Sequence, residues 1–174
     1  EVTVPRRYAT RVDTGGGNVE LTGTTGSANL HTSGGSIAVK NVTGDVLVRT
    51  SGGGIHVETI RGDVDANTSG GSVRLLSIDG RIKGHTSGGS VHCSLVGANR
   101  GISATTSGGS VRLTLPKATT GNFEATTSGG SISSDLALTM SERQGGHLKG
   151  ALNGGGPQIE ARTSGGSISV DAAD

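Results

Sequence analysis

Thr32-Ser33-Gly34-Gly35-Ser36-Ile37-Ala38-Val39 is one copy of a phrase that decides the fold of this 174-residue chain. Its core, Thr-Ser-Gly-Gly, begins at seven positions: Thr32, Thr50, Thr68, Thr86, Thr106, Thr127 and Thr163. A degenerate copy, Thr-Gly-Gly-Gly, begins at Thr14, and the intervals from Thr14 to Thr86 are all 18 residues. Self-similarity at a short fixed period is the signature of a solenoid, in which each repeat packs on its neighbours.

Apolar and polar residues alternate after each Gly-Gly corner. Val or Ile follows the corner, and a second apolar residue usually stands two places later, as in Ile37 and Val39. A third stands five places after the first in four copies: Val42, Ile60, Ile78 and Val96. A second alternating run, nine residues after the first in the regular copies, begins at Ala28, Val46, Val64, Ile82, Ile102, Phe123 and Ile159. Alternation with period two marks strands that bury one face.

The repeat therefore predicts an all-β, single-stranded, right-handed β-solenoid (β-helix) of about nine coils, with about 18 residues per coil. The handedness follows the norm for β-helices. Parity places the Thr of each phrase inward, as a ladder whose hydroxyls bond the neighbouring Thr or the corner backbone. The Gly-Gly pair is expected to supply positive φ at the tightest corner, where a side chain would clash with the next coil.

The composition fits a thin core and excludes several functions. There are 33 glycines, and the aromatic residues are Tyr8 and Phe123. The net charge of +1 gives no reason to expect nucleic-acid binding. A single cysteine, Cys93, excludes an internal disulfide framework, and no run of 18 apolar residues predicts a membrane span.

The regular spacing breaks once, between Thr127 and Thr163, which are 36 residues apart. We expect a single solenoid domain over residues 1–174, with a widened coil or loop at about 133–158 that exposes residues 139–146. Solenoids need covered ends. Either residues 1–12 and the last coil cover them, or the protein continues beyond this sequence, or copies pair end to end.

Outward columns of side chains are the candidate functional surface. One column, one place after each corner Val or Ile, contains Glu20, Ala38, His56, Arg74, His92, Arg112 and Ser133. The other, just before each Thr, contains Asp13, His31, Arg49, Asn67, His85, Thr105, Thr126 and Arg162. Their basic members are candidates for binding anionic glycans, lipid headgroups or acidic polymers, although a merely solvated face has the same composition.

Catalytic and cofactor sites have little support. Asp45 and Asp63 fall in one column and are candidates for the carboxylate pair of a glycosidase, but Asp after Gly also suits a corner. His56 and His92 lie two coils apart, ~9.6 Å by strand spacing, too far to share a metal ion. The calcium β-roll motif, Gly-Gly-x-Gly-x-Asp, is missing. We expect no cofactor, no metal and no enzymatic activity.

Two features together resemble a bacterial adhesin-like family, a domain of unknown function with glycine-rich β-strand repeats. They are Thr-Ser-Gly-Gly-Ser-Ile or -Val alternating with Gly-Asp-Val, and a late Leu-Lys-Gly-Ala-Leu-Asn-Gly-Gly-Gly-Pro at 148–157 followed by a final Thr-Ser-Gly-Gly-Ser-Ile at 163–168. The resemblance covers nearly the whole chain. It implies a β-helical domain that is exported or attached to the bacterial envelope, and it transfers no catalytic residues.

These observations favour a non-enzymatic, extracytoplasmic binding or scaffold module of the bacterial cell envelope, whether periplasmic, secreted or surface-bound. Its partner would be an envelope glycan, a lipid or a protein. The alternative is a structural module that assembles with its own copies through its ends. A polysaccharide-active enzyme is the third reading.

Overall fold

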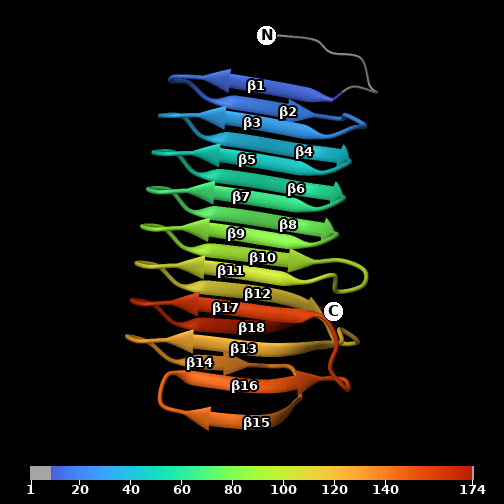
Figure 1. Cartoon of the computed structure of the whole chain (residues 1–174), viewed down its shortest axis with the longest axis vertical. Coiled ribbons are helices and arrows are strands. Elements are labelled where there is room, and N and C mark those ends of the chain that lie inside the picture. The colour runs from blue at the N-terminus through green and yellow to red at the C-terminus, as the bar shows by residue number, and fades with distance from the viewer. Residues whose placement is uncertain (1–8, 174) are drawn as a thin grey trace.

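The alternating segments form strands that pass back and forth between two sheets (Figure 1). A computed structural model describes residues 9–173. The ten-stranded sheet has the spatial order β1 (Thr10–Thr14), β3 (Ala28–Thr32), β5 (Val46–Thr50), β7 (Val64–Thr68), β9 (Ile82–Thr86), β11 (Ile102–Thr106), β17 (Gln158–Thr163), β13 (Gly121–Thr127), β16 (His147–Leu152) and β15 (Leu138–Gln144). The eight-stranded sheet has the order β14 (Ile132–Ser134), β18 (Ile168–Ala173), β12 (Val111–Pro116), β10 (Val91–Leu95), β8 (Val73–Asp79), β6 (Ile55–Arg61), β4 (Ile37–Thr43) and β2 (Val19–Thr22).

The predicted β-solenoid with about 18 residues per coil is confirmed. Strands of successive coils pair in parallel, and in the regular coils each corner Thr is the register partner of the Thr 18 residues away, as for Thr50 and Thr68. No described residue is helical. The strand pairs from β1–β2 to β11–β12 form six coils in chain order (Figure 1).

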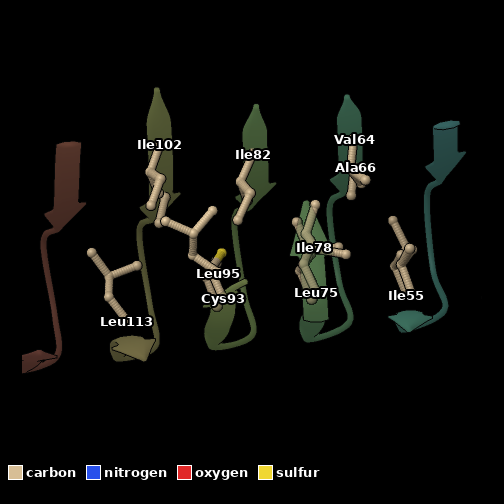
Figure 2. Close-up of a cluster of buried hydrophobic side chains, with 14 of the residues drawn as sticks. Ile55, Val64, Ala66, Leu75, Ile78, Ile82, Cys93, Leu95, Ile102 and Leu113 are labelled. Atoms are coloured by element: carbon tan, nitrogen blue, oxygen red, sulfur yellow. The ribbon is translucent and has the colours of Figure 1, made fainter. Parts of the chain in front are cut away.

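The core is a thin column of aliphatic side chains between the two sheets. Figure 2 shows Val64 and Ala66 entering it from the ten-stranded sheet, and Ile55 and Leu75 from the eight-stranded sheet. Phe123 is the largest fully buried side chain. Apart from Phe123 and Cys93, the buried members of this column are Val, Ile, Leu and Ala.

A kink in the eight-stranded sheet explains the inward residue five places after each corner. Asn41, Thr59 and Ser77 have φ of 55°, 58° and 56°, and they align in consecutive coils. One residue in the left-handed region reverses the parity of the strand, so Ile60 and Ile78 point inward. Val96, which stands five places after the corner in the fourth of these copies, does not point inward. Leu95 pairs with Ile78 instead, which leaves Val96 41% exposed.

The Thr ladder is confirmed, and its hydroxyls bond corner backbone rather than one another. Thr68 Oγ1 donates to the carbonyl of Gly53 in the preceding coil (2.8 Å) and accepts from the N–H of Gly71 in its own coil (3.4 Å). The same pair of bonds recurs at Thr32, Thr50, Thr86, Thr106, Thr127 and Thr163. Each Thr thus satisfies two polar backbone groups at a buried corner.

The Gly-Gly pair is needed for close approach between coils, as predicted, but the predicted positive φ is wrong. None of these pairs after Thr32 to Thr163 has a φ in the left-handed region. Glycine is needed because the backbone of the adjacent coil approaches too closely. A Cβ on Gly53 would overlap the Gly35 carbonyl, whereas a Cβ on Gly52 would lie 3.4 Å from the nearest atom. The second glycine of each pair is therefore the one with no space for a side chain.

The chain order breaks after the sixth coil. The coil β17–β18, which we call the inserted coil, lies between β11–β12 and β13–β14 (Figure 1). Ile159 pairs with Ile102 on one side and with Phe123 on the other, and Ile168 pairs likewise with Val111 and Ile132. Of the alternatives for covering the ends of the stack, capping by the last coil is wrong, because this coil lies inside the stack.

Residues 133–158 do not form the expected widened coil. β15 and β16 make an antiparallel hairpin through Gly145 and Gly146, and β16 pairs antiparallel with β13. The hairpin extends only the ten-stranded sheet, so it stands where a ninth coil was predicted. Within residues 9–173 it lies at the end of the stack beyond β13–β14 (Figure 1). The expectation for residues 1–8 falls outside the described residues.

Candidate functional site

The Gly-Asp corner uses its carboxylates to join coils. Asp45 Oδ1 accepts the backbone N–H of Asp63 (2.9 Å), and Asp63 Oδ1 accepts that of Arg81 (2.9 Å). A carboxylate at this place satisfies a donor at an exposed corner that has no strand partner. The Asp45–Asp63 pair is therefore engaged in corner structure, which favours the turn interpretation over a catalytic pair.

The two candidate columns lie on different sheets. His31 and Arg49 are register partners on the ten-stranded sheet, and Asn67 separates Arg49 from His85. The other column lies on the eight-stranded sheet, where His56, Arg74, His92 and Arg112 are consecutive partners. The seven candidate residues thus form two surfaces, and only the second brings four of them together without interruption.

The column on the eight-stranded sheet ends differently from the prediction. Ser133 was expected next to Arg112, but Arg112 pairs with Ser169 of the inserted coil, and Ser133 follows Ser169. The Arg112 Nε lies 3.4 Å from Ser169 Oγ and 3.3 Å from Asp171 Oδ2. The inserted coil therefore contributes two side chains beside this basic column.

A serine ladder runs beside the column and was missed in the sequence as a functional feature. In five of the six Gly-Gly-Ser copies, the Ser Oγ accepts the backbone N–H of the equivalent residue in an adjacent coil at 3.2 Å. The ladder contains Ser36, Ser72, Ser90, Ser110 and Ser167. Because each Oγ accepts this bond, its hydroxyl hydrogen remains a donor. The signal was the Ser that follows Gly-Gly in every Thr-Ser-Gly-Gly copy except the one at Thr50, and parity alone assigns this Ser to a corner.

The serine ladder and the basic column line two shallow depressions that meet. One, of about 530 Å³, runs from Asn18 and Glu20 to Ser72 and Arg74. The other, of about 410 Å³, continues from Ser72 and Arg74 to Arg112 and Ser169. We call the combined surface the His/Arg groove. It is defined by the serine ladder on one side and by His56, Arg74, His92 and Arg112 on the other.

The cations of the groove differ in how far they are neutralised. His56 Nε2 lies 3.4 Å from Glu58 Oε2, which also faces Lys40 Nζ at 3.9 Å. Arg112 is paired with Asp171. Arg74 is exposed, and no hydrogen bond or ion pair engages its guanidinium among the residues that the structure describes. Arg74 is thus the cation in the middle of the groove that is available to a ligand.

His92 lies between two arginines and is half-buried. Burial lowers its pKa below 6.5, and the neighbouring Arg112 and Arg74 lower it further, whereas Asp171 acts in the opposite direction. Its Nε2 lies 3.2 Å from Thr114 Oγ1. His92 is therefore neutral at pH 7 and presents a hydrogen-bonding ring rather than a charge.

Donors dominate the polar groups that line the middle of the groove, from Ser72 to Arg112. Serine hydroxyls, imidazoles and guanidinium groups recur at the spacing of parallel strands, ~4.8 Å per coil. Such a surface suits a ligand rich in acceptor oxygens. No group of three or more His, Cys, Asp or Glu side chains able to hold a metal ion occurs within residues 9–173. The Cys93 thiol lies in the core, where burial raises its pKa to about 12.

The stacked coils and their continuous axial groove place the chain in the class of β-solenoid repeat domains. More specifically, it belongs to the family described as Toastrack DUF4097, whose model matches residues 1–171. This is a family of unknown function. Neither a curated protein nor a solved structure matches the chain. In the described part of the chain, no helix has the length and hydrophobicity that crossing a membrane requires.

Proposed function

We propose that this chain is a non-enzymatic, extracytoplasmic, adhesin-like binding module of the bacterial cell envelope, and that it holds an extended anionic glycan along the His/Arg groove. The observation that carries the proposal is the row of donors that repeats once per coil from Ser72 to Arg112. Carboxylate, phosphate or sulfate groups of a glycan supply the matching acceptors.

The mechanism is multivalent contact. A single charge-assisted hydrogen bond contributes about 1.5–3 kcal/mol, too little for useful affinity by itself. Arg74 and Arg112 stand two coils apart, ~9.6 Å, which is comparable to an extended disaccharide. A polymer that lies parallel to the stack presents an anionic group to each arginine, and the contacts between them act at high effective concentration.

The polysaccharide-active enzyme is a weaker candidate. Glycoside hydrolysis uses two carboxyl groups that flank the bond to be cleaved. Asp45 and Asp63 accept cross-coil N–H groups, and the carboxylates beside the His/Arg groove, Glu58 and Asp171, face His56 and Arg112. Binding without turnover is the function that these contacts favour.

Co-sedimentation tests the proposal. The purified domain is incubated with peptidoglycan, with outer-membrane material and with anionic lipid vesicles, each at low and high salt. We expect salt-sensitive pelleting with a glycan-containing fraction, because exposed charge pairs are screened by salt. We also expect Arg74→Ala to weaken binding about tenfold, since it removes one charge-assisted contact.

Arg49→Ala is the matched control, because Arg49 is an exposed arginine in the equivalent column of the other sheet. It should leave binding unchanged. Pelleting with lipid vesicles alone would contradict the glycan as ligand. Equal losses from Arg49→Ala and Arg74→Ala would contradict the groove as the site, and no pelleting with any fraction would contradict envelope binding altogether.

A further inference from the structure

The inserted coil occupies a slot with a parallel strand edge on each side. β17 pairs with β11 and β13, and β18 pairs with β12 and β14. Its Ser167 accepts from Ser131, and its backbone N–H donates to Ser110. Without the segment Gln158–Ala173, the stack would have a gap in its interior rather than a shorter end.

The contacts that seat this coil are those of the repeat. Residues 127–133 and 163–169 share the identical sequence Thr-Ser-Gly-Gly-Ser-Ile-Ser. Thr163 Oγ1 donates to Gly109 O and Thr127 Oγ1 to Gly166 O, both at 2.6 Å. The slot therefore recognises a generic coil of this chain and has no means of distinguishing its own segment from the same segment of another copy.

The connection to the inserted coil has the properties of a hinge. Asn153, Gly154, Gly155 and Gly156 all have φ in the left-handed region, at 45°, 89°, 85° and 146°. Asn153 departs from the usual backbone of a non-glycine residue, so this short link stores strain. Two side-chain bonds hold it, from Asn122 Nδ2 to Gly156 O (2.9 Å) and from Asn99 Nδ2 to Pro157 O (3.0 Å), together with two backbone bonds, from Gly155 N–H to Leu152 O (3.0 Å) and from Asn122 N–H to Pro157 O (3.2 Å).

We propose that two copies of this chain exchange the segment Gln158–Ala173 about the hinge at residues 153–157, so that each copy fills the slot of the other. The exchanged dimer keeps every contact of the inserted coil, because the residues on both sides of the slot are the same. Domain exchange is favoured when the exchanged segment keeps its contacts and when the hinge is short and strained.

The exchange changes the composition of the His/Arg groove. Ser167 and Ser169 line it and Asp171 pairs with Arg112, and all three belong to the inserted coil. In the dimer each groove is therefore completed by the partner copy. This inference does not rest on glycan binding, since it follows from the strand order alone.

A pair of engineered cysteines tests the exchange. Thr105 and Arg162 are outward register partners on β11 and β17, within the Cα separation that a disulfide spans. Cys93 is fully buried and does not interfere. We expect oxidised Thr105→Cys/Arg162→Cys protein to give a covalent dimer on denaturing, non-reducing gels, in a fraction that rises with protein concentration.

The matched control is Asn67→Cys/His85→Cys, which places cysteines at the equivalent positions of β7 and β9 in the regular stack. It should give an internal disulfide and a monomer band. Gly155→Ala, which adds strain to the hinge, should raise the dimer fraction of the test pair. A disulfide that stays intramolecular at every concentration, or one that forms only in the control pair, would overturn the proposal.

Discussion

The coils from β1–β2 to β11–β12 stack in chain order, whereas the coils beyond β12 do not. Both regions use the same phrase, the same Thr ladder and the same serine ladder. The repeat therefore specifies that one coil stacks on another, but not which coil. In the regular region the short corners decide the order, because a strand can reach only the adjacent level.

Beyond β12 the order is decided by the connections. Residues 117–120 pass from β12 to β13 and skip one level, and residues 153–157 return to fill it. Three asparagine side chains tie these connections together: Asn99 to Thr120 O and Pro157 O, Asn153 to Lys117 O and Thr119 O, and Asn122 to Gly156 O. The spatial order of the last coils is therefore determined by polar loop residues rather than by the apolar core.

The largest effect should come from the second glycine of a Gly-Gly pair, where the backbones of two adjacent coils are in contact. Gly53→Ala in the regular region should lower the free energy of unfolding by about 3 kcal/mol or more, because its Cβ would overlap the backbone of the preceding coil. Gly166→Ala in the inserted coil should be as damaging, since the same overlap occurs with Gly109. Urea unfolding measures both.

Gly52→Ala is the control for this comparison, because its Cβ would have ordinary contacts. It should change stability by less than about 1 kcal/mol. If Gly166→Ala proved harmless while Gly53→Ala was severe, the inserted coil would not be seated as the regular coils are.

Asn99→Ala should have the next largest effect. Asn99 is buried, and the variant removes the side-chain donor to Thr120 O and the acceptor of Gly101 N–H, whereas Pro157 O keeps the backbone N–H of Asn122 as its donor. Because these groups are partly exposed and water can partly replace the lost bonds, we expect a loss of about 1–3 kcal/mol in the free energy of unfolding. Backbone amides should lose protection from hydrogen exchange first in β17 and later in β5 or β7.

Asn67→Ala offers a matched comparison in the regular region. The Asn67 amide donates only to the Asp65 carboxylate on the same strand. We expect a change within about 0.5 kcal/mol. Equal effects at Asn67 and Asn99 would mean that the connections do not hold the crossed order.

The smallest effect concerns His92, which lies in the regular region but senses Asp171 of the inserted coil. Because its folded pKa lies below 6.5, the unfolded chain binds the proton more readily. His92 therefore costs no stability above pH 6.5, and stability falls as the pH drops from 6.5 through the lowered pKa. His92→Gln should remove this contribution to the loss of stability at acid pH, which thermal unfolding between pH 7 and 5 measures. The control variant Ser94→Ala should leave the loss unchanged.

Asp171→Asn sharpens the same comparison. Asp171 raises the pKa of His92, so the neutral variant should lower this pKa further, as measured by NMR titration. An unchanged pKa would mean that β18 does not lie beside β12 as described.

The sequence was sufficient for most of the fold. Periodicity placed Ile37, Val39 and their equivalents inward, and it put His56, Arg74, His92 and Arg112 in one row. It failed where backbone geometry departs from simple parity. The kink at Ser77 has no counterpart in β10, so Leu95 replaces Val96 in the core. Close approach, rather than positive φ, explains Gly53.

The order of the last coils was beyond such reasoning, because the phrases at Thr127 and Thr163 are identical. The 36-residue interval and the Asn-Gly-Gly-Gly-Pro run at 153–157 were the available signals, and they indicated an irregularity without its direction. The groove was likewise missed, since the free hydrogens of the serine ladder depend on cross-coil bonds that only the structure shows.

The position of the inserted coil also has a consequence for synthesis. A ribosome delivers the chain from its N-terminus, so β13–β16 emerge before β17–β18. A solenoid in chain order can grow one level at a time as each coil appears. This one must leave an interior level vacant, or bridge it temporarily, until the final strands arrive, so its middle is completed after its end.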